Sequence, residues 1–305
     1  MALPLILDTD IGSDVDDALA LAFALRHPGI DLRAVTTVSG DVVRRAEIAK
    51  KLLQIAGRDD IEVCAGAAVE PPAGRHPWAG HEGEGLLDKD ESVEVSERDG
   101  VSLLLSQSGV PGIEVATVGM QTNLAAALNR DPSLVERLGH VTVMGGVFAP
   151  VQTQRGTAPP SIDHNLNCDP RGALRSLNAG LRVMYVPVDV TVHTPLSQDQ
   201  ADRLRKGDAL CRALTRLIDV WMRVTAGVDG RAPSDPAALL HDPLAVACTI
   251  DRSFVTIEEM PVTVALHQGA VRTFIDPAAG RAAEVVTSVD GAAFSEFWLD
   301  TVLTG

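Results

Sequence analysis

Aromatic residues, cationic residues and cysteines are all scarce in this chain of 305 residues. Phe, Trp and Tyr make up 3% of it, and Tyr185 is its one tyrosine. Hydrophobic residues still make up 46%, so we expect an aliphatic, folded core rather than a disordered chain. No apolar run reaches the roughly 20 residues of a membrane span, and the N-terminus lacks the basic start and cleavage site of a signal peptide. These absences predict a soluble, cytoplasmic protein with no membrane partner.

Positive charge is also in short supply. Lys and Arg number 26 against 41 Asp and Glu, which gives a formal net charge of −15. A nucleic-acid-binding protein needs a basic surface to neutralise phosphates, so nucleic acid is not an expected partner. The same balance disfavours a large anionic substrate held by surface charge. It remains compatible with a cation site and a neutral ligand, and equally with simple solubility.

The four cysteines are too far apart in the sequence to form a local metal or redox motif. Cys64, Cys168, Cys211 and Cys248 include no pair separated by only two or three residues, which excludes a zinc knuckle or a redox CxxC built from neighbouring residues. We expect reduced, mostly buried thiols, as in cytosolic proteins.

Short apolar runs alternate with helical patterns along most of the chain. Strands are predicted at 4–8, 31–38, 61–66, 113–119, 140–146, 181–191 and within 254–289; helices at 16–27, 42–57, 122–130, 170–180, 198–226, 236–250 and 291–303; and long loops at 68–98 and 147–165. Repeated βαβ units predict an α/β fold, with a mostly parallel, Rossmann-like open sheet flanked by helices and a β-rich C-terminal extension. We expect a single domain, 1–305.

Polar residues follow four of the predicted strands. They are the segments Asp8–Asp17, Thr37–Asp41, Gly119–Asn123 and Met144–Gly146. In open parallel sheets, ligands bind at the carboxyl ends of the strands. We therefore expect these four segments to meet at one edge of the sheet.

The stretch "DTDIGSDVDD" contains five aspartates, Asp8, Asp10, Asp14, Asp16 and Asp17. Close carboxylates raise one another's pKa and cost free energy, so a divalent cation or the N–H groups of a helix starting near Asp16 must offset their charge. Oxygen ligands without Cys or paired His favour Ca²⁺ or Mg²⁺. The spacing does not match an EF-hand loop, so further ligands must come from elsewhere in the chain.

Two later segments add candidates. In "LLHDPLAVA", Asp242 either completes a metal site, with His241 facing a ligand, or simply caps a helix that has Pro243 in its first turn. In "SIDHNLNCDP", Asp163 and Asn165 are polar loop residues, and Asp169 precedes Pro170 in the pattern of a helix start.

Together these segments resemble the inosine–uridine preferring nucleoside hydrolase family. The resemblance rests on "LILDTDIGSDVDDALAL", "AVTTVSGDV", "ATVGMQTNLA", "VTVMGG", "IDHNLNCDP" and "HDPLAVA", which occur in the family's order from Asp8 to Ala247. It implies the nucleoside hydrolase fold and hydrolysis of the N-glycosidic bond of a small-molecule nucleoside. It also implies assembly as a homodimer or homotetramer.

The resemblance further implies a metal site and two catalytic residues. One Ca²⁺ would be bound by Asp10, Asp17, Asp242 and the backbone carbonyl of Thr122. Asp10 would also accept a proton from the attacking water, and His241 would be the general acid that protonates the departing base.

Substrate contacts are expected from residues of several segments. Those residues are Asp16, Asp41, His81, Met144, Asp163 and Asn165. Asp16, Asp163 and Asn165 would hold the sugar. His81 lies in the first long loop, and Trp78 and Trp221 are further candidates for stacking on the base.

The chain departs from the usual family pattern in three places. One of them, "GMQTN" in place of GPLTN, should be tolerated because Thr122 would act through its carbonyl. Its aspartate loop is two residues longer than DxDPGxDDA, which leaves Asp14 without a role, while Asp8 is expected to support the loop from behind. Asp41 stands where the family often has asparagine. Since an ionised aspartate accepts but does not donate a hydrogen bond, a modified or non-ribose sugar stays open.

Two other functions are compatible with parts of the sequence. A haloacid dehalogenase-like, Mg²⁺-dependent phosphohydrolase also has an apolar strand followed by DxD, but Gly12 and the later motifs do not fit it. A non-catalytic calcium-binding or nucleoside-binding protein would need neither His241 as an acid nor Asp10 as a base.

Overall fold

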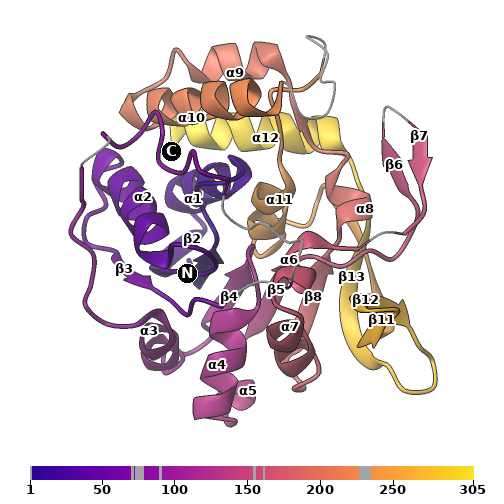
Figure 1. Ribbon diagram of the computed structural model, residues 1–305. Coiled ribbons are helices and arrows are strands. Elements are labelled where there is room, and N and C mark those ends of the chain that lie inside the picture. Colours follow the sequence, from indigo (N-terminus) through magenta and orange to yellow (C-terminus); the bar gives the residue numbers. More distant parts are fainter. Residues whose placement is uncertain are drawn as a thin grey trace.

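The computed structural model describes residues 2–69, 72, 79–88, 91–153, 156–160, 162–226 and 235–305. At its centre lies a nine-stranded sheet with the order β12-β11-β13-β8-β5-β4-β1-β2-β3 (Figure 1). These strands are β1 (Leu3–Thr9), β2 (Ile30–Thr37), β3 (Glu62–Ala65), β4 (Glu114–Thr117), β5 (His140–Met144), β8 (Arg182–Val186), β11 (Val255–His267), β12 (Ala270–Ile275) and β13 (Arg281–Val289). Neighbours from β13 to β3 pair in parallel.

Strand β1 explains why the sheet lies at the centre. Leu5 and Leu7 face one hydrophobic core and Ile6 faces the other, and none of the three has exposed surface. A parallel strand covered on both faces is a continuous apolar run rather than an alternating one. The sequence "PLILD" therefore predicted β1 correctly.

Helices cover both faces of the sheet. One core includes residues of α1 (Asp16–Arg26), α2 (Val42–Ile55), α9 (Gln198–Leu204), α10 (Ala209–Thr225), α11 (His241–Cys248) and α12 (Gly291–Thr304). The other includes residues of α3 (Gly100–Gln107), α4 (Thr122–Arg130), α5 (Leu134–Arg137), α6 (His164–Cys168) and α7 (Pro170–Leu177). Figure 1 shows α10 and α12 above the sheet and α4 and α7 below it. The predicted fold class is confirmed.

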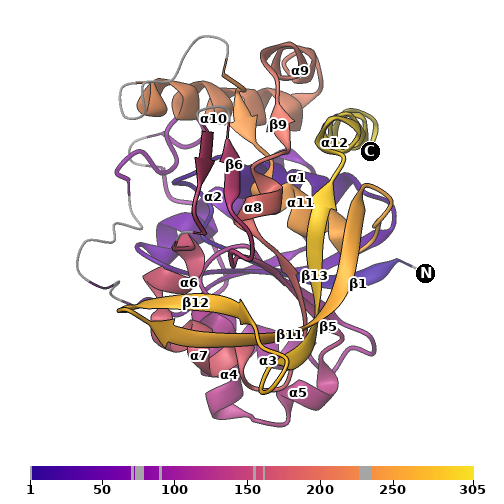
Figure 2. The ribbon, with the colours of Figure 1, turned by 90° about the vertical axis from the view of Figure 1, so that its right-hand side faces the viewer.

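The C-terminal strands form one edge of the sheet. Strand β11 pairs antiparallel with both β12 and β13, and β13 joins the parallel part through β8 (Figure 2). This arrangement confirms the predicted β-rich C-terminal extension.

The prediction for 181–191 was only partly right. Strand β8 ends at Val186, and the short helix α8 (Val188–Thr191) follows Pro187. Proline has no N–H to continue a strand ladder and fits at a helix start, so the chain turns there. Thr191 therefore lies on a helix and not on a strand.

Other segments contain more structure than predicted. The loop 147–165 includes the strands β6 (Val151–Thr153) and β7 (Gly156–Ala158), which pair as a hairpin. Helix α3 had no predicted counterpart. Helices α9 and α10 divide the predicted helix 198–226, and a second small sheet pairs β9 (Pro195–Leu196) with β10 (Ala238–Leu239).

All four cysteines are buried and free, as expected. Within the described part of the chain, no helix is long and apolar enough to cross a membrane.

Candidate active site

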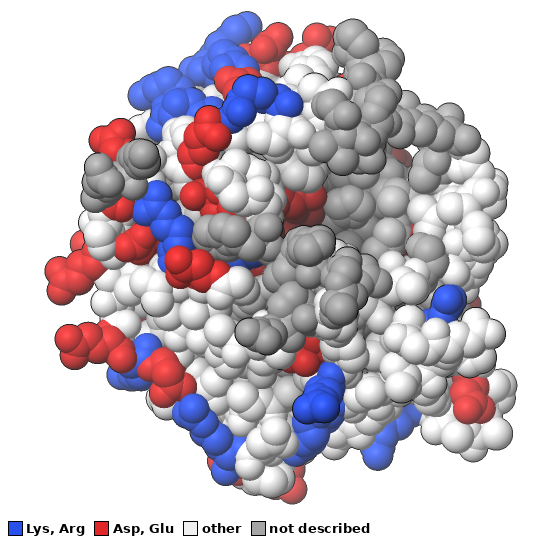
Figure 3. Space-filling view, viewed as in Figure 1, with Lys and Arg blue, Asp and Glu red and all other residues white. Residues whose placement is uncertain are grey.

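The carboxyl ends of the parallel strands open into a cavity of about 430 Å³. Figure 3 shows acidic side chains inside a hollow on this face of the molecule. The cavity is lined by Asp10, Ser13, Asp14, Asp16, Asp17, Ala79, Val118, Met144, Ile162, Asp163, His164, Asn165, Val188, Trp221, His241 and Asp242. Residues that follow β1, β4, β5 and β8 thus meet at one place.

The aspartate loop connects β1 to α1 and is fixed by hydrogen bonds to the carboxylates of Asp16 and Asp17. One oxygen of Asp17 accepts from the Asp10 N–H at 3.1 Å and from the Thr9 hydroxyl. Asp16 accepts a hydrogen bond from the backbone N–H of Asp242, at the start of α11. The Asp16 carboxylate is therefore held against α11, whereas Asp17 is held by the start of its own loop.

Asp16, Asp17 and Asp242 form a cluster that could hold a metal ion. Each is buried and offers an oxygen, and these oxygens lie within 4.8 Å of one another. Burial, followed by repulsion from neighbouring aspartates that include Asp10 and Asp14, raises the pKa of all three well above the usual range for aspartate. A divalent cation would remove this repulsion, and a donor set made only of oxygens fits Ca²⁺ or Mg²⁺.

Asp8 lies behind the cluster, as a support for the strand end. One of its oxygens accepts from Thr36 Oγ1 at 2.6 Å and Asn123 Nδ2 at 2.7 Å, and burial raises its pKa to about 7. The Asn123 amide also donates to the Thr37 carbonyl and accepts from the Ala67 N–H. Thr36 and Asn123 lie inside quoted motifs but were not singled out from the sequence.

His241 begins α11 and faces the same cavity. Its Nδ1 lies 2.6 Å from Thr191 Oγ1, and burial lowers its pKa to about 4. The ring is therefore neutral near pH 7. Nothing in the sequence pointed to Thr191, which is 50 residues away and lies in the segment predicted as a strand.

Asp163 and Asn165 enter the cavity from α6. Asp163 caps this helix by accepting from the Leu166 N–H at 2.6 Å. Asn165 Nδ2 donates to the carbonyls of Val118 at 2.7 Å and Met144 at 3.2 Å. The amide is thus tied to the ends of β4 and β5, which fixes its position beside Met144.

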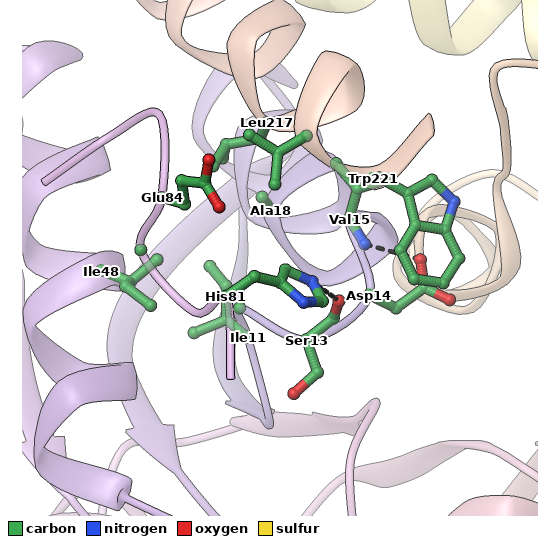
Figure 4. A pocket seen from close by; sticks show the side chains of 13 residues that line it. Ile11, Ser13, Asp14, Val15, Ala18, Ile48, His81, Glu84, Leu217 and Trp221 are labelled. Carbon is green, nitrogen blue, oxygen red and sulfur yellow. Dashed lines mark hydrogen bonds between the residues drawn. The ribbon is translucent and has the colours of Figure 1, made fainter. Parts of the chain in front are cut away.

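Three predicted residues lie outside the described cavity lining. Asp41 is exposed and caps α2 by accepting from the Arg44 N–H at 3.0 Å. The Thr122 hydroxyl, at the start of α4, donates to Asp169 at 2.7 Å. His81 lines a smaller adjoining pocket together with Trp221, and its Nε2 lies 2.7 Å from the Ser13 carbonyl (Figure 4). Trp78 lies outside the described residues.

Asp14 borders both the main cavity and the adjoining pocket. It accepts from the Val15 N–H at 2.6 Å, and burial raises its pKa to about 6. In Figure 4 its side chain lies beside the indole of Trp221. The longer aspartate loop thus places one more carboxylate at the wall of the cavity.

A model of the inosine–uridine preferring nucleoside hydrolases matches residues 5–296. The chain belongs to this family. It is therefore an N-glycosyl hydrolase that acts on ribonucleosides. Membership explains the DxD stretch and the later motifs together, which the haloacid dehalogenase alternative left unexplained.

Several nucleoside hydrolases and related proteins are similar to this chain over most of their length. A protein of Schizosaccharomyces pombe described as uncharacterized is 30% identical over 252 residues, which cover 79% of this chain and 78% of that protein. The pyrimidine-specific ribonucleoside hydrolase RihA of Salmonella newport is 27% identical over 270 residues, covering 85% and 83%. The solved plant nucleoside hydrolase PpNRh1 covers 100% of both chains with a TM-score of 0.85 and 23% identity, a likeness that shows the fold.

Gly119→Ala should lower activity by displacing Asp10, the residue expected from the sequence to act as the base. A Cβ at Gly119 would lie 2.6 Å from Asp10 Oδ1 and 2.9 Å from Asp10 N, so Asp10 must move. We expect kcat/KM to fall about 100-fold, because small misplacements at a reacting centre are costly. Gly109→Ala is the control, since its Cβ would meet only one atom, at 3.6 Å. Equal activity of the two variants would contradict the prediction.

Proposed function

We propose that the chain cleaves nucleosides with the help of one calcium ion, bound by Asp10, Asp17, Asp242 and the backbone carbonyl of Thr122. The observation that carries the proposal is that Asp10 lines the same cavity as His241 and as the buried cluster of Asp16, Asp17 and Asp242. Oxygen ligands of this kind suit calcium, and water molecules and sugar hydroxyls would complete its high coordination number. When bound, calcium supplies positive charge that orients and acidifies a water molecule.

Asp10 is the general base of the proposed mechanism. It lines the cavity beside the cluster and is less deeply buried than Asp16 and Asp17. Metal binding would acidify the attacking water only weakly, so the Asp10 carboxylate would have to lie within hydrogen-bond reach of that water and take its proton. As the glycosidic bond breaks, positive charge develops on the sugar ring, and the surrounding carboxylates stabilise it.

His241 is the proposed general acid for the leaving base. The short contact between Thr191 Oγ1 and Nδ1 is best met by a hydroxyl that donates to Nδ1, because the alternative acceptor, the Val188 carbonyl, lies 3.5 Å away. A neutral ring that accepts at Nδ1 carries its proton at Nε2. That N–H can then donate a hydrogen bond to the departing base, and complete transfer of a proton proceeds from the imidazolium form, which returns to the neutral ring.

The remaining predicted residues are proposed to hold the substrate. Asp16, Asp163 and Asn165 hold sugar hydroxyls, and Met144 packs against the ligand from the end of β5. His81 contacts the base from the adjoining pocket. Asp41 is proposed as a further sugar contact. The assay described below identifies the preferred base and sugar.

Released sugar from a panel of purine and pyrimidine nucleosides tests the proposal, together with the metal content of the purified protein. We expect ribonucleosides to be cleaved and their 5′-monophosphates to be cleaved at least about 100-fold more slowly, since the described lining includes six aspartates and no Lys or Arg. Bound calcium is expected. No sugar from any nucleoside, together with no bound calcium, would overturn the proposal and favour a binding protein.

The assembly state and the cellular location remain predictions. A homodimer or homotetramer would be seen as a multiple of the 32.2 kDa chain mass in size-exclusion chromatography with light scattering. A cytoplasmic location would be seen by cell fractionation.

A further inference from the structure

Arg45 of α2 is a fully buried arginine beneath the aspartate loop. Its Nε donates to the Ser39 carbonyl at 2.8 Å, Nη1 to the Ile11 carbonyl at 2.9 Å and Nη2 to Ser13 Oγ at 3.1 Å. Burying a guanidinium is costly unless its N–H groups are paired. This arginine spans the distance between the end of β2 and the aspartate loop, so its burial serves to fix the loop.

Ser13 connects Arg45 to a second loop. Its hydroxyl accepts from Arg45 and donates to Glu82 Oε1 at 2.6 Å, and its carbonyl contacts His81 Nε2 at 2.7 Å. Glu82 is also buried, and its two oxygens accept from the backbone N–H groups of Ala79 and Gly80. A chain of hydrogen bonds thus runs from α2 through Ser13 to the residues around His81.

The connection uses the part of the aspartate loop in which this chain is longer than the usual family pattern. Gly12 has φ +122°, and a Cβ there would lie 2.8 Å from Ile48 Cδ1 of α2. The loop is therefore packed tightly on α2 just before Ser13. Ser13 and Asp14 then line the cavity.

Other contacts hold the neighbouring parts of the site independently. Arg216 donates to the Gly85 carbonyl at 2.9 Å, and Arg44 donates to the Glu91 carbonyl at 2.8 Å. Asp17 is held by Thr9 and by the Asp10 N–H. Loss of the Ser13 hydroxyl should therefore affect residues 79–82 rather than the later loop or the carboxylate cluster.

We propose that Arg45, Ser13 and Glu82 form a positioning relay that holds residues 79–82, with His81, against the aspartate loop and so shapes the substrate cavity. The proposal rests on the proposed function, because it assigns these residues to substrate binding at the same site. They are positioning residues and take no part in the bond-breaking step.

Ser13→Ala is the central test, since it removes the hydroxyl and keeps the carbonyl that His81 contacts. We expect KM for the best nucleoside to rise about tenfold, the loss that one buried charge-assisted hydrogen bond represents, with kcat changed less than about threefold. Calcium affinity by titration calorimetry should be unchanged. Ser295→Ala is the matched control, because its hydroxyl is also buried and donates to the Gly291 carbonyl at 2.8 Å in α12.

Hydrogen–deuterium exchange without substrate gives a second readout. In Ser13→Ala, exchange should rise at Ala79 and Gly80, whose N–H groups donate to Glu82, and stay unchanged at 85–88. Glu82→Gln should show the same exchange pattern. The KM of the Ser13→Ala/Glu82→Gln variant should be no higher than that of the more affected single variant, because both changes break the same relay. Arg45→Lys keeps the positive charge but lacks the several N–H donors of the planar guanidinium, so we expect the same changes in KM and exchange as in Ser13→Ala.

Unchanged exchange at Ala79 and Gly80 in Ser13→Ala would overturn the proposed relay. A fall in kcat as large as the rise in KM would also overturn it. So would a loss of kcat/KM in the Ser13→Ala/Glu82→Gln variant equal to the product of the two single losses. The proposed function fails separately, if the wild-type protein releases no sugar. The exchange measurement needs no turnover, so it tests the relay even if the wild-type protein is inactive.

Discussion

His241→Ala is expected to slow the hydrolysis of inosine or uridine by about 10²–10⁴-fold, the usual contribution of a general acid. The same change should slow a p-nitrophenyl riboside by less than about tenfold, because nitrophenolate leaves without a proton. His241 is the half-buried ring that faces the cavity from the start of α11. Steady-state rates on both substrates measure the effect, and equal losses would contradict a leaving-group acid.

Thr191→Val is the matched control for this prediction. It keeps the shape of the side chain and removes the hydroxyl that lies 2.6 Å from His241 Nδ1. If that hydroxyl fixes the proton on Nε2, the variant should show the same dependence on leaving group with a smaller loss, about tenfold on inosine or uridine. A Thr191→Val enzyme that lost more on the nitrophenyl riboside would argue against this role.

The effect of Asp242→Asn on stability is expected to have opposite signs in the calcium-bound and the calcium-free protein. With calcium present, the variant should be less stable than the wild type and bind calcium more than ~100-fold more weakly. Loss of a residue that only hydrogen-bonds to a metal ligand already lowers metal affinity by about 10–100-fold, and loss of a ligand itself should lower it further. In EGTA the variant should be more stable than the wild type. The physical reason is that Asp16, Asp17 and Asp242 repel one another when no cation lies between them.

Thermal unfolding of both proteins in calcium and in EGTA measures this reversal, and calorimetry gives the affinity. Wild-type activity should be lost in EGTA and return with calcium. Asp300→Asn is the control, because it makes the same chemical change at an exposed ion pair with Arg203 and should leave both stabilities nearly unchanged. A variant destabilised equally in both conditions would show that Asp242 is structural and holds no metal.

Local sequence patterns determined much of the fold. The run "PLILD" predicted β1 because both faces of a central parallel strand are buried. Helix α7 was predicted from Asp169 and Pro170, and in the structure Asp169 caps it by accepting from the Gly172 N–H. The position of the cavity followed from the rule for strand ends, since Asp10, Val118 and Met144 line it where β1, β4 and β5 end.

Tertiary structure alone decided how the site is completed. Arg45 looks like an ordinary surface residue of an amphipathic helix, yet it is fully buried because the aspartate loop folds over it. Asp41 follows β2 as predicted, but it caps α2 and faces solvent. Thr191 reaches His241 only because the chain turns into α8 after Pro187. Spacing in a sequence indicates which face of an element a side chain occupies, whereas contacts between residues far apart depend on how the elements pack.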